Sequence, residues 1–230
     1  MAELLRETAL FAIVLTLGTY EFGMWLQKKT KSAICNPILI SVILVIAVLS
    51  LLKIPVGDYK AGCEIFSWLL TPATVALAVP LYEQLKVQKK NLPAICVGVL
   101  AGTLTSLACV ALLCGVFGLE DTMLASLLPK SITTALGIAV SEQLGGLTAV
   151  TTSVIALTGI LGNIIGSSLC ALLKIKDPVA QGVAFGTASH VAGTSRASEI
   201  SELTGAVSSL SLVVAGILTA ILCPALYSVL

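Results

Sequence analysis

The residues best suited to chemistry lie inside a long apolar stretch, where Pro129, Lys130 and Ser131 are followed by Thr133 and Thr134. A lysine at membrane depth is energetically costly, so it usually marks a functional site. Thr133 and Thr134 lie three and four residues beyond Lys130, which places them on one face of a helix with it. Together with the free backbone N–H groups of a helix break, these side chains could hold a small anion. The alternative is that Lys130 extends to the membrane surface while the hydroxyls bond the preceding turn.

A second polar group surrounds His190, the only histidine in the chain. Ser189 and Thr194 flank it with hydroxyls that could bind the same anion, and the imidazole could carry a proton because its ordinary pKa is about 6.5. A histidine that serves packing alone is the competing interpretation. Arg196 and Glu199 are three residues apart, so they either neutralise each other or let Arg196 bind a substrate carboxylate through two donors.

The composition around these groups indicates a membrane protein. Hydrophobic residues make up 57% of the 230 residues and charged residues only 11%, and the mean hydropathy is +1.04, unlike a soluble domain. Windows long enough to cross about 30 Å of hydrocarbon recur along the chain. They lie at roughly 8–25, 35–52, 62–82, 92–117, 122–141, 147–173, 179–198 and 204–229. We predict one all-α polytopic membrane domain over residues 1–230, with about seven to eight transmembrane segments.

The distribution of charge predicts the orientation of these segments. The lysines at 28–31 and 86–90 are expected in the cytoplasm, which places the amino terminus and Asp121 outside. Lys176 is also expected in the cytoplasm, and this requires an odd number of crossings after Asp121. A re-entrant hairpin around Pro129 supplies that number, while a straight eight-helix arrangement is the alternative.

Small and hydroxyl-bearing residues also predict where helices are discontinuous. We expect breaks at Pro72 and Thr74, at Pro129, and at Gly186 and Gly193. Interrupted segments in corresponding positions of two halves are typical of inverted-repeat transporters, whose substrate lies near the midplane. The pattern therefore favours an inverted-repeat, transporter-like architecture with broken helices.

Several other classes of function are disfavoured. The net charge is +1 and no long basic run occurs, so nucleic acid is not an expected partner. The seven cysteines form no Cys-x-x-Cys pair and no metal-ligand cluster surrounds His190, so the cysteines are interpreted as apolar packing residues. No nucleophile-elbow or zinc-protease motif is present. We expect neither an enzyme nor a metal or other cofactor.

Four separated motifs carry a resemblance to a known family: Asn36 to Ile40, Thr71 to Tyr82, Leu128 to Thr134, and His190 to Ala197. In their content and order, over nearly the whole chain, the sequence resembles the LrgB/CidB family. The resemblance implies a multi-pass protein of the bacterial cytoplasmic membrane, described as an antiholin-like or holin-like regulator of murein hydrolase activity and autolysis. It also implies a small LrgA/CidA-like membrane partner, and we expect a homo-oligomer in the lipid bilayer.

The same family includes the plastid glycolate/glycerate translocator, and bacterial members are linked to pyruvate uptake. Two functions therefore stay open: transport of small monocarboxylates, and regulation of murein hydrolase export. The polar groups at the expected breaks favour transport. The residues predicted to bind the anion are Lys130, Ser131, Thr133, Thr134, Ser189, His190, Thr194 and Arg196.

Overall fold

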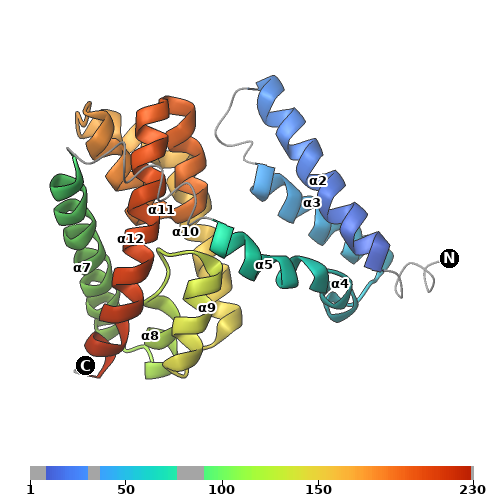
Figure 1. Ribbon diagram of the computed structural model, residues 1–230. Helices are drawn as coiled ribbons and strands as arrows, with labels where there is room; N and C mark the ends of the chain where they lie inside the picture. Colours follow the sequence, from blue (N-terminus) through green and yellow to red (C-terminus); the bar gives the residue numbers. More distant parts are fainter. Residues whose placement is uncertain (1–8, 31–36, 77–90, 229–230) are drawn as a thin grey trace. The chain divides into compact units, whose positions relative to one another are not determined.

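The chain folds as an assembly of helices in a computed structural model that describes residues 9–30, 37–76 and 91–228 (Figure 1). It divides into two compact units, Met1–Val75 and Ala76–Leu230. The first unit holds α2 (Ala9–Thr30), α3 (Pro37–Leu52), α4 (Val56–Gly62) and α5 (Glu64–Ala76, which ends just past its boundary). The second holds α7 (Leu92–Phe117), α8 (Asp121–Leu127), α9 (Thr134–Gln143), α10 (Thr148–Leu172), α11 (Pro178–Ile200) and α12 (Glu202–Tyr227).

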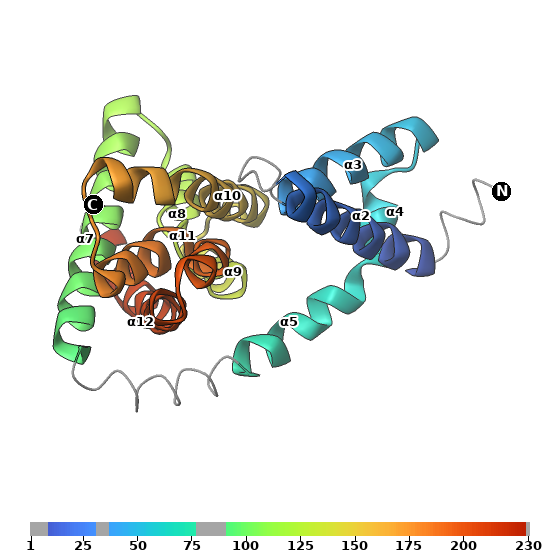
Figure 2. The same ribbon diagram turned by 90° about the horizontal axis from the view of Figure 1, so that it is seen from above.

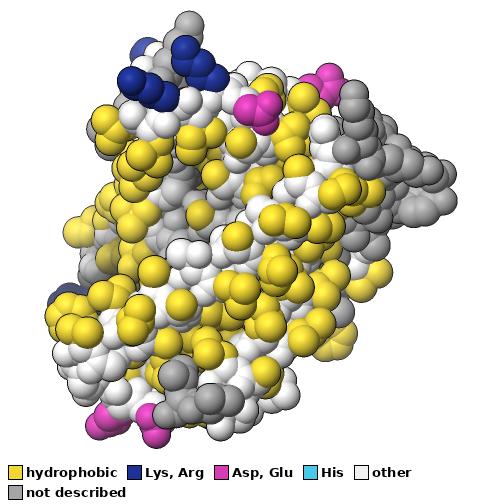
Figure 3. Space-filling model, turned by 90° about the vertical axis from the view of Figure 1, so that its left-hand side faces the viewer, with side chains coloured by type: hydrophobic (Ala, Val, Ile, Leu, Met, Phe, Trp, Pro, Cys, Tyr) yellow, Lys and Arg dark blue, Asp and Glu magenta, His cyan; other side chains and the backbone are white. Residues whose placement is uncertain are grey.

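Four of the described helices are long and apolar enough to cross a membrane: α2, α7, α10 and α12. On the face shown in Figure 3, hydrophobic side chains cover the middle, Lys and Arg side chains gather at one end, and acidic side chains lie at both ends. This distribution suits a protein surrounded by lipid, because only its ends meet water and headgroups.

In the first unit, α2 and α3 pack as an antiparallel pair. Gly23 faces Pro37, and Oγ1 of Thr19 lies 2.8 Å from Oγ of Ser41. The earlier residue of α2, Thr19, therefore meets the later residue of α3, Ser41, so the two helices run in opposite directions.

In the second unit, α7 and α12 run in the same direction and share an apolar core. Buried residues near the end of α7, including Val110 and Cys114, pack with Cys223 near the end of α12. Near the start of α7, Ile95 and Val99 pack with Val207 near the start of α12. Figure 1 shows the two helices side by side along most of their length.

The segment between α7 and α10 folds back on itself as a hairpin of α8 and α9. Gly118 ends α7 in a left-handed conformation with φ 61°, and α8 then returns along α7. Residues 128–133 form the turn, and Leu128 packs into the core beside Leu107. After α9 the chain comes back to α8, where the N–H of Leu147 donates to Oγ of Ser126 at 2.7 Å.

Helix α11 also reverses direction, at Ser189 and His190, whose backbone angles are not helical. A methyl group built on Gly193 would approach the carbonyl oxygen of Phe185 to 2.7 Å. In a straight helix, residues eight apart are separated by about 12 Å along the axis. Phe185 and Ala197 also pack in one cluster. Residues 178–188 and 191–200 therefore form the two halves of a second hairpin, the α11 hairpin.

The two hairpins approach the middle of α7 from opposite ends. In the first half of α11, Val183 faces Gly98 and Thr187 faces Gly102, so this half runs parallel to the start of α7. Helix α8 instead starts at the far end of α7 and runs back towards Ser106. Seen from above in Figure 2, α11 lies among α7, α10 and α12.

The structure differs from the expected helix breaks at one of three places. Pro72 lies inside α5, which continues through Thr74 to Ala76, so no break is seen there. Pro129 lies in the turn between α8 and α9, as predicted. The third break also occurs in the predicted stretch, at Ser189 and His190 between Gly186 and Gly193. Both glycines are themselves helical, and they allow Ser211 and Phe185 to approach closely.

We expected seven to eight crossings, whereas the described residues contain four helices long and apolar enough to cross a membrane. The windows at 122–141 and 179–198 are the two hairpins. Their apolar content is similar to that of a crossing helix, so hydropathy alone counts each of them as a crossing. The re-entrant hairpin around Pro129 agrees with the geometry, whereas the straight eight-helix alternative does not. The proposed inverted repeat compared 62–82 with 179–198, and residues 77–82 lie outside the described part of the chain, so the repeat stays a prediction.

Candidate functional site

Lys130 lies at the turn of the α8–α9 hairpin among hydroxyl groups. Its Nζ donates to Oγ of Ser131 at 2.9 Å and to Oγ of Ser106 at 3.2 Å. The two hydroxyl oxygens lie 3.2 Å from each other. Lys130 is half-buried, and within the described residues it has no carboxylate partner. Its positive charge is therefore solvated by neutral groups, an arrangement that leaves it able to attract an anion.

Thr133 and Thr134 lie where the hairpin turn becomes α9. Thr133 has extended backbone angles, φ −63° and ψ 148°, and it precedes the first residue of the helix without capping it through its side chain. Its Oγ1 is buried and has no hydrogen-bond partner. Buried hydroxyls are normally satisfied, so this one is available to a ligand or a water molecule. The first turn of α9 adds free N–H groups that also favour an anion.

His190 forms the turn of the α11 hairpin in a strained conformation, with φ 42° and ψ −136°. Its Nε2 lies 2.9 Å from the carbonyl oxygen of Ile155 in α10. Two glycines of α10 make room for this turn, because a methyl group on Gly159 would come within 2.6 Å of the imidazole and one on Gly162 would overlap Ser189. Asn163 adds a hydrogen bond of 2.9 Å from its Nδ2 to the carbonyl of Ala192.

Ile155 and one turn of α7 bring the two hairpin turns into the same region. The side chain of Ile155 packs against Gly137 of α9, and its carbonyl oxygen contacts His190. On α7, Ser106 contacts Lys130 while Gly102 contacts Thr187. Those two positions of α7 are about 6 Å apart along the helix axis. The two hairpin turns therefore lie against the same stretches of α7 and α10, near the middle of a helix that is long enough to span the bilayer, and the candidate site lies there.

Ser189 and Thr194 are engaged within the protein. The Ser189 side chain packs against Gly162. Oγ1 of Thr194 donates to the carbonyl of His190 at 2.9 Å and lies 2.8 Å from Oγ of Ser208. A hydroxyl bonded back to the preceding turn supports the local fold. These contacts give both residues a part in holding the turn.

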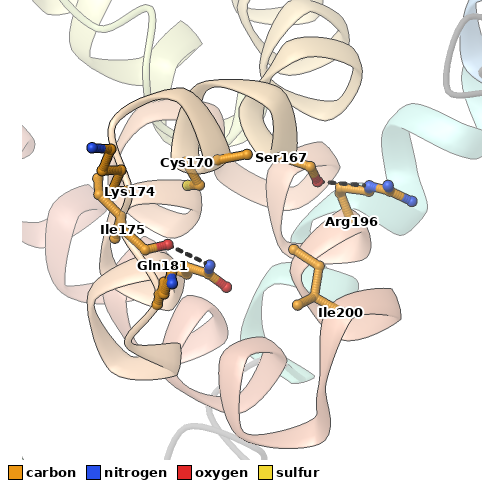
Figure 4. Close-up of a pocket in the computed structure, with 9 residues that line it drawn as sticks. Ser167, Cys170, Lys174, Ile175, Gln181, Arg196 and Ile200 are labelled. Carbon is orange, nitrogen blue, oxygen red and sulfur yellow. Dashed lines mark hydrogen bonds between the residues drawn. The ribbon is translucent and has the colours of Figure 1, made fainter.

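Arg196 is not brought together with Lys130. It lies near the open end of the α11 hairpin, where its Nε donates to Oγ of Ser167 at 3.0 Å and its guanidinium pairs with Glu199. Ser167 lies about 18 Å along α10 from Ile155. Figure 4 shows Arg196 beside Ser167, with Lys174 at the opposite edge of the same pocket. The ion pair with Glu199 is one of the two alternatives left open by the spacing. The reversal of α11 explains why Arg196 lies far from Lys130.

Several polar residues of this region were not among the site residues predicted from the sequence. Ser106 completes the surroundings of Lys130, and the hydroxyls of Thr103, Thr187 and Ser211 are buried without a partner on α7, α11 and α12. Isolated hydroxyl residues in the middle of apolar helices were the available signal. Within the described ranges, no three His, Cys, Asp or Glu side chains lie close enough to share a metal ion.

Comparison with known proteins assigns the family. The model of the LrgB-like family matches residues 16–229. The holin-like protein CidB of Staphylococcus aureus strain Mu50 is 35% identical over 218 residues, covering 95% of each chain. The antiholin-like protein LrgB of Bacillus subtilis strain 168 is 32% identical over 215 residues, covering 93% of each. No solved structure matches the chain. With its four candidate membrane spans, this chain is a multi-pass cell-membrane protein that belongs to the LrgB-like family.

Proposed function

We propose that the protein binds a small anion where the two hairpins meet and moves it across the membrane. The observation that carries this proposal is the positive charge of Lys130, whose hydrogen bonds within the described residues go to the hydroxyls of Ser131 and Ser106. The hydroxyl of Thr133, in the same hairpin turn, has no partner there. A structural lysine in an apolar protein would be expected to have a carboxylate partner.

A small monocarboxylate fits this arrangement. One carboxylate carries one negative charge, which Lys130 neutralises, and its oxygens accept hydrogen bonds from Ser131, Thr133 and Thr134. Pyruvate, glycolate and glycerate have this chemistry, and the latter two add hydroxyls. Half-helix ends near the midplane are also how many transporters hold charged substrates.

The α11 hairpin has a supporting part in this mechanism. His190 fixes the turn through Ile155, and its imidazole is the group whose protonation could couple proton movement to transport. Ser189 and Thr194 maintain the turn, and Arg196 belongs to the distant pocket. Each hairpin enters from a different end of α7, so a shift of either one would open the site towards its own side.

The test is uptake of labelled pyruvate, glycolate or glycerate by proteoliposomes that contain the purified protein. Saturable uptake is expected, and Lys130→Gln should reduce it by about tenfold or more because a charge-assisted contact is lost. Lys60→Gln is the matched control, since it removes an exposed lysine from α4. Saturable uptake that is unchanged by Lys130→Gln would remove this site.

The second candidate is a holin-like or antiholin-like role in regulating murein hydrolase export and autolysis. The relatives' names support this function, and they give no support to monocarboxylate transport. They also suggest a non-enzymatic membrane protein. In this proposal the protein forms a homo-oligomer in the bilayer, or acts with a small LrgA/CidA-like partner, and it changes membrane permeability.

Dye release separates the two candidates. A holin-like assembly should release a trapped fluorescent dye of several hundred daltons from liposomes, whereas a carrier should retain the dye while it takes up carboxylate. Release without saturable uptake would favour the second candidate. Release that requires co-reconstitution of the partner would assign the permeability change to the pair.

A further inference from the structure

A pocket of about 450 Å³ lies at the open end of the α11 hairpin, away from the site where the hairpins meet. The end of α10 contributes Ser167 and Cys170, and the following loop contributes Lys174 and Lys176. The α11 hairpin lines the pocket from both halves, with Gln181 from the first and Arg196 and Ile200 from the second. Figure 4 shows the labelled groups around the cavity: Ser167, Cys170, Lys174, Gln181, Arg196 and Ile200.

The local backbone explains why the pocket forms. Lys174 adopts a left-handed conformation with φ 57°, which turns the chain sharply after α10. Asp177 then caps α11 by accepting from the N–H of Ala180 at 2.9 Å, and Gln181 donates to the carbonyl of Ile175 at 2.7 Å. These contacts fix the loop, while the reversal of α11 brings Arg196 back to the same end of the molecule.

The charges of the pocket are only partly compensated. Glu199 pairs with Arg196, which also donates to Ser167. Lys174 and Lys176 have no acidic partner within the part of the chain that the structure describes. Asp177, the nearest acidic neighbour in sequence, is engaged in capping the helix. The pocket therefore keeps a net positive charge from its two lysines.

The remaining lining is apolar, with Cys170, Ile175 and Ile200 beside the basic groups. The pocket also lies where the spanning helix α10 ends, which is the level of the lipid headgroups. Basic pockets between helices at this level are suited to phosphate-bearing headgroups. A lone phosphate is much smaller than 450 Å³, so a phosphate attached to a larger group matches the volume better.

We propose that this pocket binds a phosphate-bearing anion, with Lys174 and Lys176 neutralising the phosphate and Arg196 providing further donors at the opposite edge. Such a ligand would contact the end of α10 and both halves of the α11 hairpin at once. A bound ligand would therefore hold the two halves of the α11 hairpin together at the end away from His190. The proposal concerns a different site from the proposed anion site at Lys130 and does not depend on it.

The experiment measures the melting temperature of the purified full-length protein in nanodiscs. Wild type is compared with Lys174→Gln/Lys176→Gln and with a control, Lys28→Gln/Lys60→Gln, that loses the same charge on exposed residues of the first unit. Each protein is studied in phosphatidylcholine, in phosphatidylcholine with a phosphatidylglycerol fraction, and in phosphatidylcholine with millimolar inorganic phosphate or glycerol phosphate. All three are expected to melt alike in phosphatidylcholine alone, because its choline neutralises its phosphate and leaves no net negative charge for the two lysines to bind.

Binding is expected to raise the melting temperature of wild type and of the control by roughly 3 °C or more, with at least half of that shift lost in the pocket variant. A shift with phosphatidylglycerol alone identifies a lipid headgroup, and a shift with the soluble phosphates identifies a free ligand. No shift in any arm, or equal shifts in all three proteins, overturns the proposal. Should the double variant fail to fold, Lys174→Gln and Lys176→Gln are titrated singly, and unchanged shifts in both also overturn it.

Discussion

The imidazole nitrogen Nε2 of His190 lies 2.9 Å from the carbonyl oxygen of Ile155, and this contact ties the turn of the α11 hairpin to α10. The Ile155 side chain packs against Gly137 of the other hairpin. One residue of α10 therefore contacts both hairpins. A movement of either hairpin must change the surroundings of this residue, which makes it the structural link between the two turns.

Replacing Thr133 by valine should separate ligand binding from stability. The Thr133 hydroxyl is buried without a partner, so its removal should leave the melting temperature unchanged or slightly higher. Saturable uptake should nevertheless weaken, with a rise in KM, because the anion loses a donor.

Thr194→Val is the matched comparison, since that hydroxyl makes two hydrogen bonds, and its loss should destabilise the protein by about 1–2 kcal/mol. A strong loss of stability in Thr133→Val, with uptake intact, would contradict the assignment of Thr133 to the site.

The backbone of His190 predicts an unusual order of stabilities. With φ 42° and ψ −136°, this position disfavours every residue with a side chain, and glycine adopts such angles most easily. His190→Ala loses the contact with Ile155 and keeps the strain, whereas His190→Gly loses the contact and relieves the strain. The His190→Gly variant should therefore be more stable than the His190→Ala variant by about 1 kcal/mol. Thermal unfolding of both variants in one detergent checks this, and a less stable glycine variant would argue against the reversal at His190.

The small residues of α10 should be required for packing of the α11 hairpin. A methyl group on Gly162 would overlap the side chain of Ser189, so Gly162→Ala should lower stability by about 1–3 kcal/mol. Gly115→Ala in α7 is the control, because open space surrounds that glycine and alanine favours a helix by up to about 1 kcal/mol. Equal melting temperatures for the two variants would indicate that α10 and α11 do not pack in this way.

Labelling from each side of the membrane tests the reversal of α11 directly. In a functional variant without native cysteines, Lys176→Cys and Glu202→Cys should react with an impermeant reagent from the same side, because α11 returns to its starting end. Asp121→Cys should react from the opposite side, since α10 is the spanning helix between it and Lys176. Labelling of positions 176 and 202 from opposite sides would mean that α11 crosses the membrane.

The sequence alone determined the class of protein and much of the polar site. Its apolar composition indicated a membrane protein, and charges at segment ends favoured a non-crossing element after Asp121, where the structure has the α8–α9 hairpin. The cost of a membrane-embedded lysine singled out Lys130, and the structure places Ser131 against it. Spacing also gave the pair of Arg196 with Glu199 as one of two alternatives, and the structure contains it. These properties depend on short-range spacing and on the free energy of transferring each side chain from water to the membrane, and both can be read from the sequence.

Only the tertiary structure decided which polar groups meet. Hydropathy cannot distinguish a crossing from a hairpin of similar length, because both bury about the same number of apolar residues. The reversal at His190 depends on contacts with Gly159 and Gly162 of another helix, and it carries Arg196 away from Lys130. Ser106 joins the site through packing of α7 against the hairpin turn. Long-range packing places these groups, and no local pattern in the sequence encodes it.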